Sequence, residues 1–210
     1  MLEDRRQAGR LLAERLEKYS GKDPLVLALP RGGAAVAAEI VDIIGGRLGL
    51  IISRKIGAPR NPELAIGAVA PDRSVILDKK MVKETGATAE YLKREARIEA
   101  IEIDRRKNIY GSDLKGEDAA GKIVILVDDG IATGHTMRSA VRFLKKMRPK
   151  KIIVAVPVLP GESVKDFRAE VDELVYLDAP DDFGAIGAHY KKFPQLTDGE
   201  VVRFLKGQKT

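Results

Sequence analysis

The sequence has no cysteine, no tryptophan and only two histidines, and aromatic residues make up 5% of its 210 positions. Without cysteine it can form neither a disulfide nor a thiolate metal site, which fits a reducing compartment. No apolar run approaches the roughly 20 residues that span a bilayer. The first six residues are mostly charged and lack the apolar stretch of a signal peptide. We therefore expect a cytoplasmic protein with no membrane partner.

Charged residues are abundant, at 32% of the chain, and give a formal net charge of +6. A basic balance is compatible with nucleic acid, a membrane surface or phosphorylated small molecules as the partner. The two signs of charge are mixed along the chain, without a long basic tract, and aromatic residues for base stacking are few. Nucleic acid is therefore not the expected main ligand.

Short apolar runs alternate with helical patterns along the chain. The expected buried strands are residues 25–29, 48–53, 123–127, 152–158 and 173–177. The expected helices are residues 4–19, 34–44, 136–147 and 161–169, with a last one that begins at the capping-box pattern of residues 197–200. Strands separated by helices favour an open, mostly parallel sheet flanked by helices, which is an α/β fold. The length fits one domain, residues 1–210.

Two segments depart from this alternation. Residues 79–110 are helical and highly charged, with a break near Gly86, and are interpreted as a helical insertion. Residues 54–63 contain two arginines, a lysine and two prolines, and are expected to form a polar, mobile loop. Residues 65–70 and 74–77 are expected to be two further strands.

The segment from Ile123 to Thr136 carries the most chemical information. An apolar strand delivers Asp128 and Asp129, and a short glycine-containing loop leads into a helix. In open α/β sheets, ligands bind beyond the carboxyl ends of the strands, and a helix N-terminus offers free N–H groups and a positive dipole end to a phosphate. The two acids can accept hydrogen bonds from vicinal hydroxyls of an attached sugar and suit Mg²⁺, directly or through water. The expected phosphate-binding residues are Ala132, Thr133, Gly134, His135 and Thr136.

Either half of this segment has a simpler interpretation. Asp-Asp-Gly after a strand is often only a turn, and Thr-Gly-His-Thr can serve merely to cap a helix. The combination of the two, in this order and at a strand-to-helix junction, favours the phosphate site. A phosphatase of the haloacid dehalogenase type is disfavoured, because that family needs Asp-x-Asp after its first strand and this chain has Asp-Asp late in the sequence.

The stretch from Val124 to Thr136 resembles the phosphoribosyl pyrophosphate (PRPP) signature of the type I phosphoribosyltransferases. That signature consists of several apolar residues, two acids, a small loop, Thr-Gly and a final hydroxyl residue. In the family the two acids hold the ribose hydroxyls and the loop cradles the 5-phosphate. The resemblance implies a magnesium-dependent glycosyltransferase that moves the phosphoribosyl group of PRPP to a small nitrogenous base and releases pyrophosphate. It also implies a small C-terminal hood over the base and a homodimer.

The resemblance extends to two segments upstream. Leu29-Pro30-Arg31-Gly32-Gly33 falls where the family keeps its pyrophosphate loop, so Arg31, Gly32 and Gly33 are expected to bind pyrophosphate. Residues 54–63 fall where the family has its mobile catalytic loop, which adds Arg54 and Lys55 to the pyrophosphate ligands. Arg31 and Lys55 are the candidate catalytic residues, because they would stabilise the leaving charge. No general base is assigned.

The acceptor base is less well defined by the sequence. The 6-oxopurine enzymes of the family carry an acid immediately before Thr-Gly, whereas this chain has Ala132, which cannot transfer a proton. The stretch from Arg31 to Ala70 and the segment from Asp182 to Tyr190 resemble a subgroup of phosphoribosyltransferases whose acceptor is unknown. Phe183 and Tyr190, two of the scarce aromatics, lie in a Gly-Ala-rich stretch and are the candidate acceptor-binding residues. They have an alternative interpretation as core residues.

A second class of function remains open. The chain would then be a non-catalytic regulator that binds PRPP or a nucleotide and acts on RNA or on a partner protein. The basic balance permits this interpretation. Turnover distinguishes the two classes, because a regulator binds the ligand without consuming it.

Overall fold

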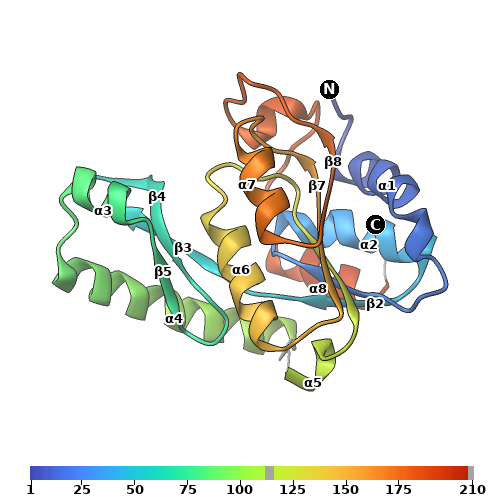
Figure 1. Cartoon of the computed structure of the whole chain (residues 1–210), viewed down its shortest axis with the longest axis horizontal. Coiled ribbons are helices and arrows are strands. Elements are labelled where there is room, and N and C mark those ends of the chain that lie inside the picture. Colours follow the sequence, from blue (N-terminus) through green and yellow to red (C-terminus); the bar gives the residue numbers. More distant parts are fainter. Residues whose placement is uncertain (112–115, 208–210) are drawn as a thin grey trace.

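The computed structural model describes residues 1–111 and 116–207 and shows a five-stranded parallel sheet flanked by helices (Figure 1). The strand order is β2 (Arg47–Leu50), β1 (Leu25–Ala28), β6 (Ile123–Val127), β7 (Lys151–Val158) and β8 (Glu173–Asp178). Every neighbouring pair in this sheet runs parallel. The expected α/β fold with a parallel sheet is confirmed.

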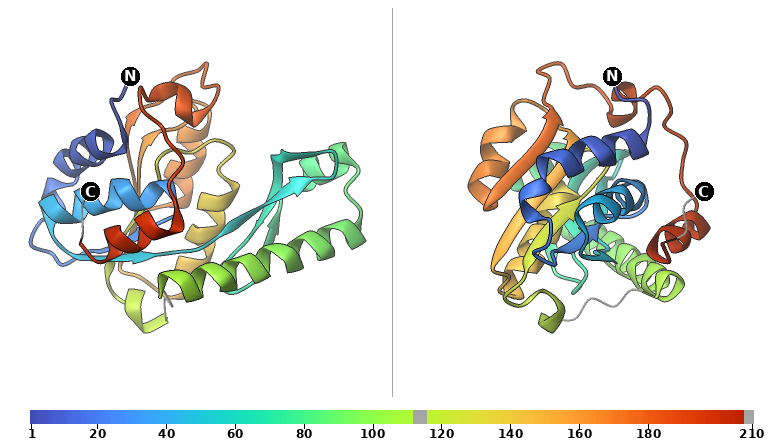
Figure 2. Two further views of the ribbon diagram at one scale, coloured as in Figure 1. Left: turned by 180° about the vertical axis from the view of Figure 1, so that it is seen from behind. Right: turned by 90° about the vertical axis from the view of Figure 1, so that its right-hand side faces the viewer.

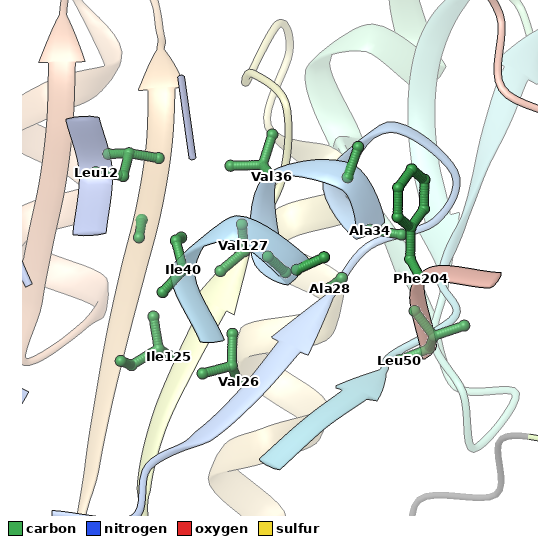
Figure 3. Close-up of a cluster of buried hydrophobic side chains, with 14 of the residues drawn as sticks. Leu12, Val26, Ala28, Ala34, Val36, Ile40, Leu50, Ile125, Val127 and Phe204 are labelled. Carbon is green, nitrogen blue, oxygen red and sulfur yellow. The ribbon is translucent and has the colours of Figure 1, made fainter. Parts of the chain in front are cut away.

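Side chains alternate between the two faces of this sheet, as the pleat requires. Val26, Ala28, Ile125 and Val127 join one buried cluster, which Figure 3 shows beneath α2 (Gly32–Ile44). The helices α1 (Arg5–Arg15) and α8 (Asp198–Leu205) contribute to the same cluster. The alternate strand residues join a second cluster with α6 (His135–Lys146) and α7 (Ser163–Glu170) on the opposite face. The runs are apolar throughout because both faces are buried.

The order in which the chain adds strands to the sheet reverses between β1 and β6. From β1 the chain passes through α2 to β2 on one side, whereas from β6 it passes through α6 and α7 to β7 and β8 on the other. The two strands are adjacent, with Ala28 paired with Val127 at their carboxyl ends. Segments that leave adjacent strands in opposite directions open a crevice at that edge, and ligands of such sheets bind there. The fold therefore places the loops after Ala28 and Val127 side by side.

Residues 54–110 form an arm beside the sheet (Figures 1 and 2). The arm consists of an antiparallel sheet of β3 (Arg54–Ala58), β4 (Asn61–Val69) and β5 (Val75–Leu77), followed by α3 (Lys79–Thr85) and α4 (Ala89–Tyr110). The helical insertion is confirmed, and Gly86 ends α3 in the left-handed conformation that glycine adopts without strain. Buried residues of the arm such as Ile56, Ile66 and Ile103 belong to the cluster that α2 joins.

The expectation of a long loop at residues 54–63 was wrong. The segment is a β-hairpin in which β3 and β4 pair around a short turn at Pro59 and Arg60. Register shifts occur on both sides of Gly57, and Pro62 lies in β4 opposite this irregularity. Proline is tolerated in a strand where the ladder is already interrupted, so its presence does not exclude a strand.

The N-terminal residues pair with the segment between β8 and α8. Leu2 forms a parallel bridge with Tyr190, and the N–H groups of Lys191 and Lys192 donate to the carbonyls of Leu2 and Glu3. The segment between β8 and α8 includes the short helix η2 (Ile186–His189) and forms the predicted small hood. Thr197 and Glu200 make the expected capping box at the start of α8. The remaining short elements are η1 (Glu17–Tyr19) and α5 (Gly116–Ala119).

No helix within the described residues combines the length and the apolar character that crossing a bilayer requires.

Candidate active site

Asp128 lies at the carboxyl end of β6 and lines a pocket of about 260 Å³. It is half-buried, and its Oδ1 accepts a hydrogen bond from the N–H of Asp129 at 2.8 Å. Burial, followed by the negative charge of Asp129, raises the pKa of Asp128 well above its usual range. A carboxylate in this position is an acceptor for hydroxyl groups of a ligand in the pocket.

Asp129, by contrast, is directed into the protein. Its Oδ2 lies 2.7 Å from Nε of Arg5 on α1, and both side chains are almost completely buried. The main-chain carbonyl of Asp129 accepts a hydrogen bond from the hydroxyl of Tyr190 at 2.7 Å. Asp128 therefore lines the pocket, while Asp129 is bound by Arg5 on α1 and by Tyr190 from the segment after β8.

The loop after the acids follows the wall of the same pocket. The pocket is lined by Gly130, Ile131, Ala132, Thr133, Gly134, Thr136 and Met137 from the loop and the first turn of α6. Gly134 is the N-cap of α6 and has a φ of 76°, a left-handed conformation that favours glycine. The first N–H groups of a helix lack intrahelical acceptors, and the dipole is positive at this end. These features make the start of α6 a suitable anion site, as the sequence predicts.

Arg138 in α6 contacts this loop and helps to fix its position. Its Nη1 donates to the carbonyl of Thr133 at 3.2 Å, and its Nε pairs with Glu170 on α7 at 2.8 Å. The guanidinium lies 4.5 Å from the centroid of the Phe167 ring. A Cβ added at Gly134 would lie 2.7 Å from Nη1 of Arg138 and 3.0 Å from the Phe167 ring. The glycine is needed both for its left-handed backbone and for this close packing.

His135 opens α6, but its side chain turns away from the pocket-lining residues. Its Nε2 lies 3.6 Å from Oδ2 of Asp78, which caps α3 of the arm. The other ring nitrogen, Nδ1, is buried and has no hydrogen-bond partner among the described residues. Burial lowers the pKa of His135, although the carboxylate of Asp78 acts in the opposite direction. His135 therefore offers the anion site its main chain, while its ring contacts the arm.

The loop after β1 packs directly against the acid pair. The peptide bond between Pro30 and Arg31 is cis. A Cβ at Gly32 would lie 1.8 Å from Oδ2 of Asp129, and one at Gly33 would lie 2.9 Å from Cα of Asp128. A side chain at position 32 or 33 would therefore collide with the acid pair, so Gly32 and Gly33 are needed for the loop to pack this closely. The side chain of Arg31 is directed elsewhere, with Nη1 4.0 Å from Oδ1 of Asp198 at the start of α8.

The hairpin of the arm contributes a cation to the pocket. Lys55, Glu63 and Ala65 line the pocket opposite the loop that follows Asp128. Nζ of Lys55 lies 2.7 Å from Oε2 of Glu63, whose side chain is 89% exposed. Arg54 is not among the lining residues, because successive side chains of a strand point to opposite faces, and it pairs instead with Glu99 on α4 at 2.7 Å. Of the two predicted cations, the structure brings Lys55 to the pocket.

The predicted stacking role of Phe183 and Tyr190 needs correction. Tyr190 is buried, its ring packs 4.9 Å from that of Phe193, and its hydroxyl bonds to the main chain of Asp129. Burial raises the pKa of this hydroxyl. Phe183 is buried against His189, with ring centroids 4.9 Å apart. The hood residue that lines the pocket is Ile186, whose side chain packs so closely on Gly130 that a Cβ there would lie 2.6 Å from it.

The described residues contain no group of three or more His, Cys, Asp or Glu side chains that could hold a metal ion. Asp128 and Glu63 are the carboxylates that line the pocket. Mg²⁺ is commonly held by one or two carboxylates together with substrate phosphates and several waters. The residues of the pocket therefore fit Mg²⁺ that arrives with a phosphorylated ligand better than Mg²⁺ bound by the protein alone.

Sequence patterns did not identify three residues of the site. Arg5 lies in the expected amphipathic helix of residues 4–19, where nothing distinguishes a buried arginine from an exposed one. Glu63 and Ile186 both fall inside segments that were assigned to the site for other residues. Glu63 and Ile186 lie at the pocket because the hairpin and the hood fold toward it. Neither of these segments has a hydrophobic periodicity that the sequence would reveal.

A family model of the phosphoribosyl transferase domain matches residues 2–192. The chain belongs to this family. The match covers the loop after β1, the arm, the acid pair and most of the hood, which are the parts that surround the pocket.

Individual relatives of this phosphoribosyl transferase domain agree with the family match. The solved structure of TT1426 from Thermus thermophilus is 38% identical, with a TM-score of 0.77 and 99% of each chain covered. A provisionally named phosphoribosyl transferase of Mycobacterium tuberculosis is 38% identical over 98% of this chain, which corresponds to 46% of the relative. The chain thus spans about half the length of that relative. A purine phosphoribosyltransferase from Pyrococcus horikoshii, 18% identical with a TM-score of 0.50 over 91% of each chain, shares the fold.

Proposed function

We propose that this domain transfers the 5-phosphoribosyl group of PRPP to a nitrogen atom of a small base and releases pyrophosphate. The observation that carries the proposal is one pocket that combines an acid, an anion site at a helix N-terminus and a cation. Asp128 provides the acid, residues 130–136 provide the anion site, and Lys55 provides the cation. These are the groups that a ribose with a phosphate at one end and a pyrophosphate at the other requires.

Each group has a distinct part in binding. The N–H groups at the start of α6, with the hydroxyls of Thr133 and Thr136, would hold the 5-phosphate. Asp128 would accept hydrogen bonds from the ribose hydroxyls and hold Mg²⁺, directly or through water. When bound, Mg²⁺ would neutralise charge on the pyrophosphate. The main-chain N–H groups of Gly32 and Gly33 are the expected contacts for the pyrophosphate on the other side of Asp128.

The transfer itself requires little covalent work from the protein. The bond between C1 of the ribose and the pyrophosphate oxygen breaks, its electrons leave with pyrophosphate, and the lone pair of the base nitrogen forms a new bond to C1, while the proton that this nitrogen carried is released to water. Holding the two reactants in line and stabilising the departing charge are the main contributions. Lys55 is already in the pocket for the second role, whereas Arg31 would have to leave the neighbourhood of Asp198 to reach it.

The acceptor base is proposed to lie beneath the hood, against Ile186. An isoleucine offers an apolar surface to a flat ring without hydrogen-bond specificity. Ala132, exposed at the rim of the pocket, cannot donate or accept a proton at the base. A 6-oxopurine that depends on an acid at this position is therefore not the expected acceptor.

A screen of nitrogenous bases with PRPP and Mg²⁺, read by release of pyrophosphate, tests the proposal. We expect release with at least one base and its loss in Asp128→Asn. Loss of a charged hydrogen bond should weaken PRPP binding by about 1.5–3 kcal/mol in this variant. Asp182→Asn, at an exposed hood position, is the matched control and should behave as the wild type.

Two results would contradict the proposal. If calorimetry detects no binding of PRPP in the presence of Mg²⁺, PRPP is not the substrate. Binding of PRPP without pyrophosphate release from any base would instead favour the regulatory function.

A further inference from the structure

The side chain of His135 connects the anion site to the arm. His135 is the first residue of α6, so its main chain belongs to the anion site, but its ring is not among the groups that line the pocket. The ring is 14% exposed, and its Nε2 lies 3.6 Å from Oδ2 of Asp78. Removing a polar ring from water costs free energy unless the ring gains a partner, so a neighbouring carboxylate is a specific contact for this histidine.

Asp78 is tied to the strand of the arm that reaches the pocket. Its main-chain N–H donates to the carbonyl of Ile66 in β4 at 3.0 Å. Glu63 of the same strand lines the pocket, and its Oε2 lies 2.7 Å from Nζ of Lys55 on the neighbouring strand β3. The contact between His135 and Asp78 therefore joins the anion site to the hairpin that brings Lys55 to the pocket.

The two oxygens of the Asp78 carboxylate have different partners. Oδ1 accepts a hydrogen bond from the N–H of Met81 at 3.0 Å and so caps α3, whereas Oδ2 faces the ring of His135. The hydrogen bond from the main chain of Met81 lowers the pKa of Asp78, so this carboxyl is charged at neutral pH. A charged carboxylate attracts a protonated imidazole much more strongly than a neutral one.

The charge of the His135 ring depends on groups from both elements that meet there. Burial lowers the pKa of the ring, the carboxylate of Asp78 from α3 raises it, and the guanidinium of Arg138 from α6 lowers it. Nδ1 is buried without a hydrogen-bond partner in the part of the chain that the structure describes, so a protonated ring would leave an N–H unpaired there. A phosphate at the first N–H groups of α6 adds negative charge beside the ring and favours its protonated form. Phosphate binding would therefore strengthen the attraction between His135 and Asp78.

We infer that His135 is a positioning residue, whose ring couples binding of a phosphate at the start of α6 to the placement of Lys55 in the pocket. The inference rests on the proposed function, because it assumes that the pocket binds a sugar phosphate and pyrophosphate together. When the phosphate binds, His135 pairs with Asp78, β4 is held against the start of α6, and Lys55 is fixed where pyrophosphate would lie. The ring acts through the arm and does not touch the reacting atoms.

The test measures the coupling between the two parts of the pocket. Affinity for pyrophosphate with Mg²⁺ is measured by calorimetry in the absence and in the presence of saturating ribose 5-phosphate, which occupies the anion site through its phosphate. The ratio of the two dissociation constants is the coupling factor, and by linkage it is the same whichever ligand binds first. The affinity for ribose 5-phosphate alone reports whether the anion site itself is intact.

Three variants separate the contact from the general attachment of the arm. Asp78→Asn keeps an oxygen that can cap α3 but removes the charge that faces the ring. His135→Phe keeps an aromatic ring and the main-chain N–H of the anion site. The control is Asp72→Asn, which removes another ion pair between the arm and α6, because Oδ2 of Asp72 lies 2.6 Å from Nζ of Lys146 at the far end of that helix.

We expect ribose 5-phosphate to raise the affinity of the wild type for pyrophosphate by about fivefold or more, the usual size of a coupling between two sites. In Asp78→Asn and in His135→Phe this increase should fall below about twofold. Affinity for ribose 5-phosphate alone should stay within about threefold of the wild type, because the N–H groups that bind the phosphate are unchanged. Asp72→Asn should keep the coupling factor of the wild type.

The protonation of His135 gives a second measurement, which a merely structural side chain would not affect. The chain has two histidines, so their NMR signals are assigned by comparison with His189→Gln. Ribose 5-phosphate should raise the pKa of His135 in the wild type. In the protein without ligand, Asp78→Asn should lower this pKa, because the carboxylate that raises it is gone.

The inference is overturned if Asp78→Asn keeps the coupling factor of the wild type, or if Asp72→Asn loses it to the same extent, because the arm would then act as a whole. It is also overturned if ribose 5-phosphate leaves the pKa of His135 unchanged. If His135→Phe does not fold, Asp78→Asn decides the test, because its side chain is 36% exposed and its cap is retained. A wild type that binds neither ligand refutes the proposed function, whereas a wild type that binds both without coupling refutes the inference alone.

Discussion

Replacement of Gly32 by alanine should destabilise the protein through a single collision. The new Cβ would lie 1.8 Å from Oδ2 and 2.3 Å from Cγ of Asp129, far inside any allowed contact. Backbone strain is not the cause, because Gly32 is the first residue of α2 and has no positive φ. Either the carboxylate or the glycine loop must therefore move.

The size of the effect follows from what holds the carboxylate. Displacing Asp129 separates it from Arg5, and breaking a buried ion pair costs about 3–5 kcal/mol. Moving the loop instead amounts to overpacking, which costs about 1–3 kcal/mol. The protein will take the less costly route, so we expect a loss of about 3 kcal/mol or somewhat less. For a chain of this length that corresponds to a fall in melting temperature of roughly 6–12 °C.

Gly199→Ala is a suitable control for this experiment. Gly199 also lies in the first turn of a helix, α8, but the nearest atom to its Cβ would be Oγ1 of Thr197 at 3.9 Å. This variant should be neutral or more stable by up to about 1 kcal/mol, because alanine restricts the unfolded chain. Thermal and denaturant unfolding of both variants provide the comparison.

A double-mutant cycle identifies the cause of the destabilisation. In an Asp129→Ala background the obstructing carboxylate is absent, so Gly32→Ala should then cost no more than about 0.5 kcal/mol. If the two substitutions are additive, the collision with Asp129 is not the source of the effect, and the described packing of the glycine loop on the acid is refuted.

Two further predictions concern charged groups. Lys55→Met should weaken binding of pyrophosphate about tenfold, because it removes a charged donor from the pocket. Arg60→Met, in the exposed hairpin turn, is the control and should leave this binding unchanged. Equal pyrophosphate affinities of the two variants in titrations would contradict the role of Lys55. For Glu173, burial acts to raise the pKa, but hydrogen bonds from Lys151, Lys18 and Tyr19 outweigh it and lower the pKa to about 2. A lowered carboxyl pKa stabilises the fold above pH 4.5, the usual value, and this contribution of about 1–3 kcal/mol is lost as the pH falls toward about 2. Urea titrations between those pH values should therefore show a weaker pH dependence for Glu173→Gln, and parallel curves would refute the assignment.

The central sheet could be predicted from the sequence because its strands are apolar on both faces. Residues 123–127 are the predicted and the observed strand, and the break of the insertion falls at Gly86 as expected. The hairpin at residues 54–63 could not be predicted in the same way. Its strands alternate polar and apolar residues only partly and contain Pro62, so their pairing depends on packing against α4 and α6.

The part of the candidate site that lines the pocket could also be predicted, because the acids, the loop that follows them and the start of α6 are contiguous in sequence. The residues that support it are not. Arg5 and Asp129 are 124 positions apart, and no local pattern links them. Scarcity of aromatics suggested a base-stacking role for Tyr190, yet a buried tyrosine needs a partner for its hydroxyl, and here that partner is the main chain of Asp129.

The contacts of Arg5 also determine when the site can be completed during synthesis of the protein. The strand β6 and the loop after it need only residues up to the start of α6, but Arg5 is oriented by Phe193 and Pro194, which are translated much later. Contacts between residues so distant in sequence form late, because the intervening chain must first be ordered. A nascent chain that has made the acids and the loop therefore still lacks the contacts that fix Arg5 against Asp129. A ligand would then bind only to molecules whose hood has already folded, and by mass action its binding would stabilise those molecules.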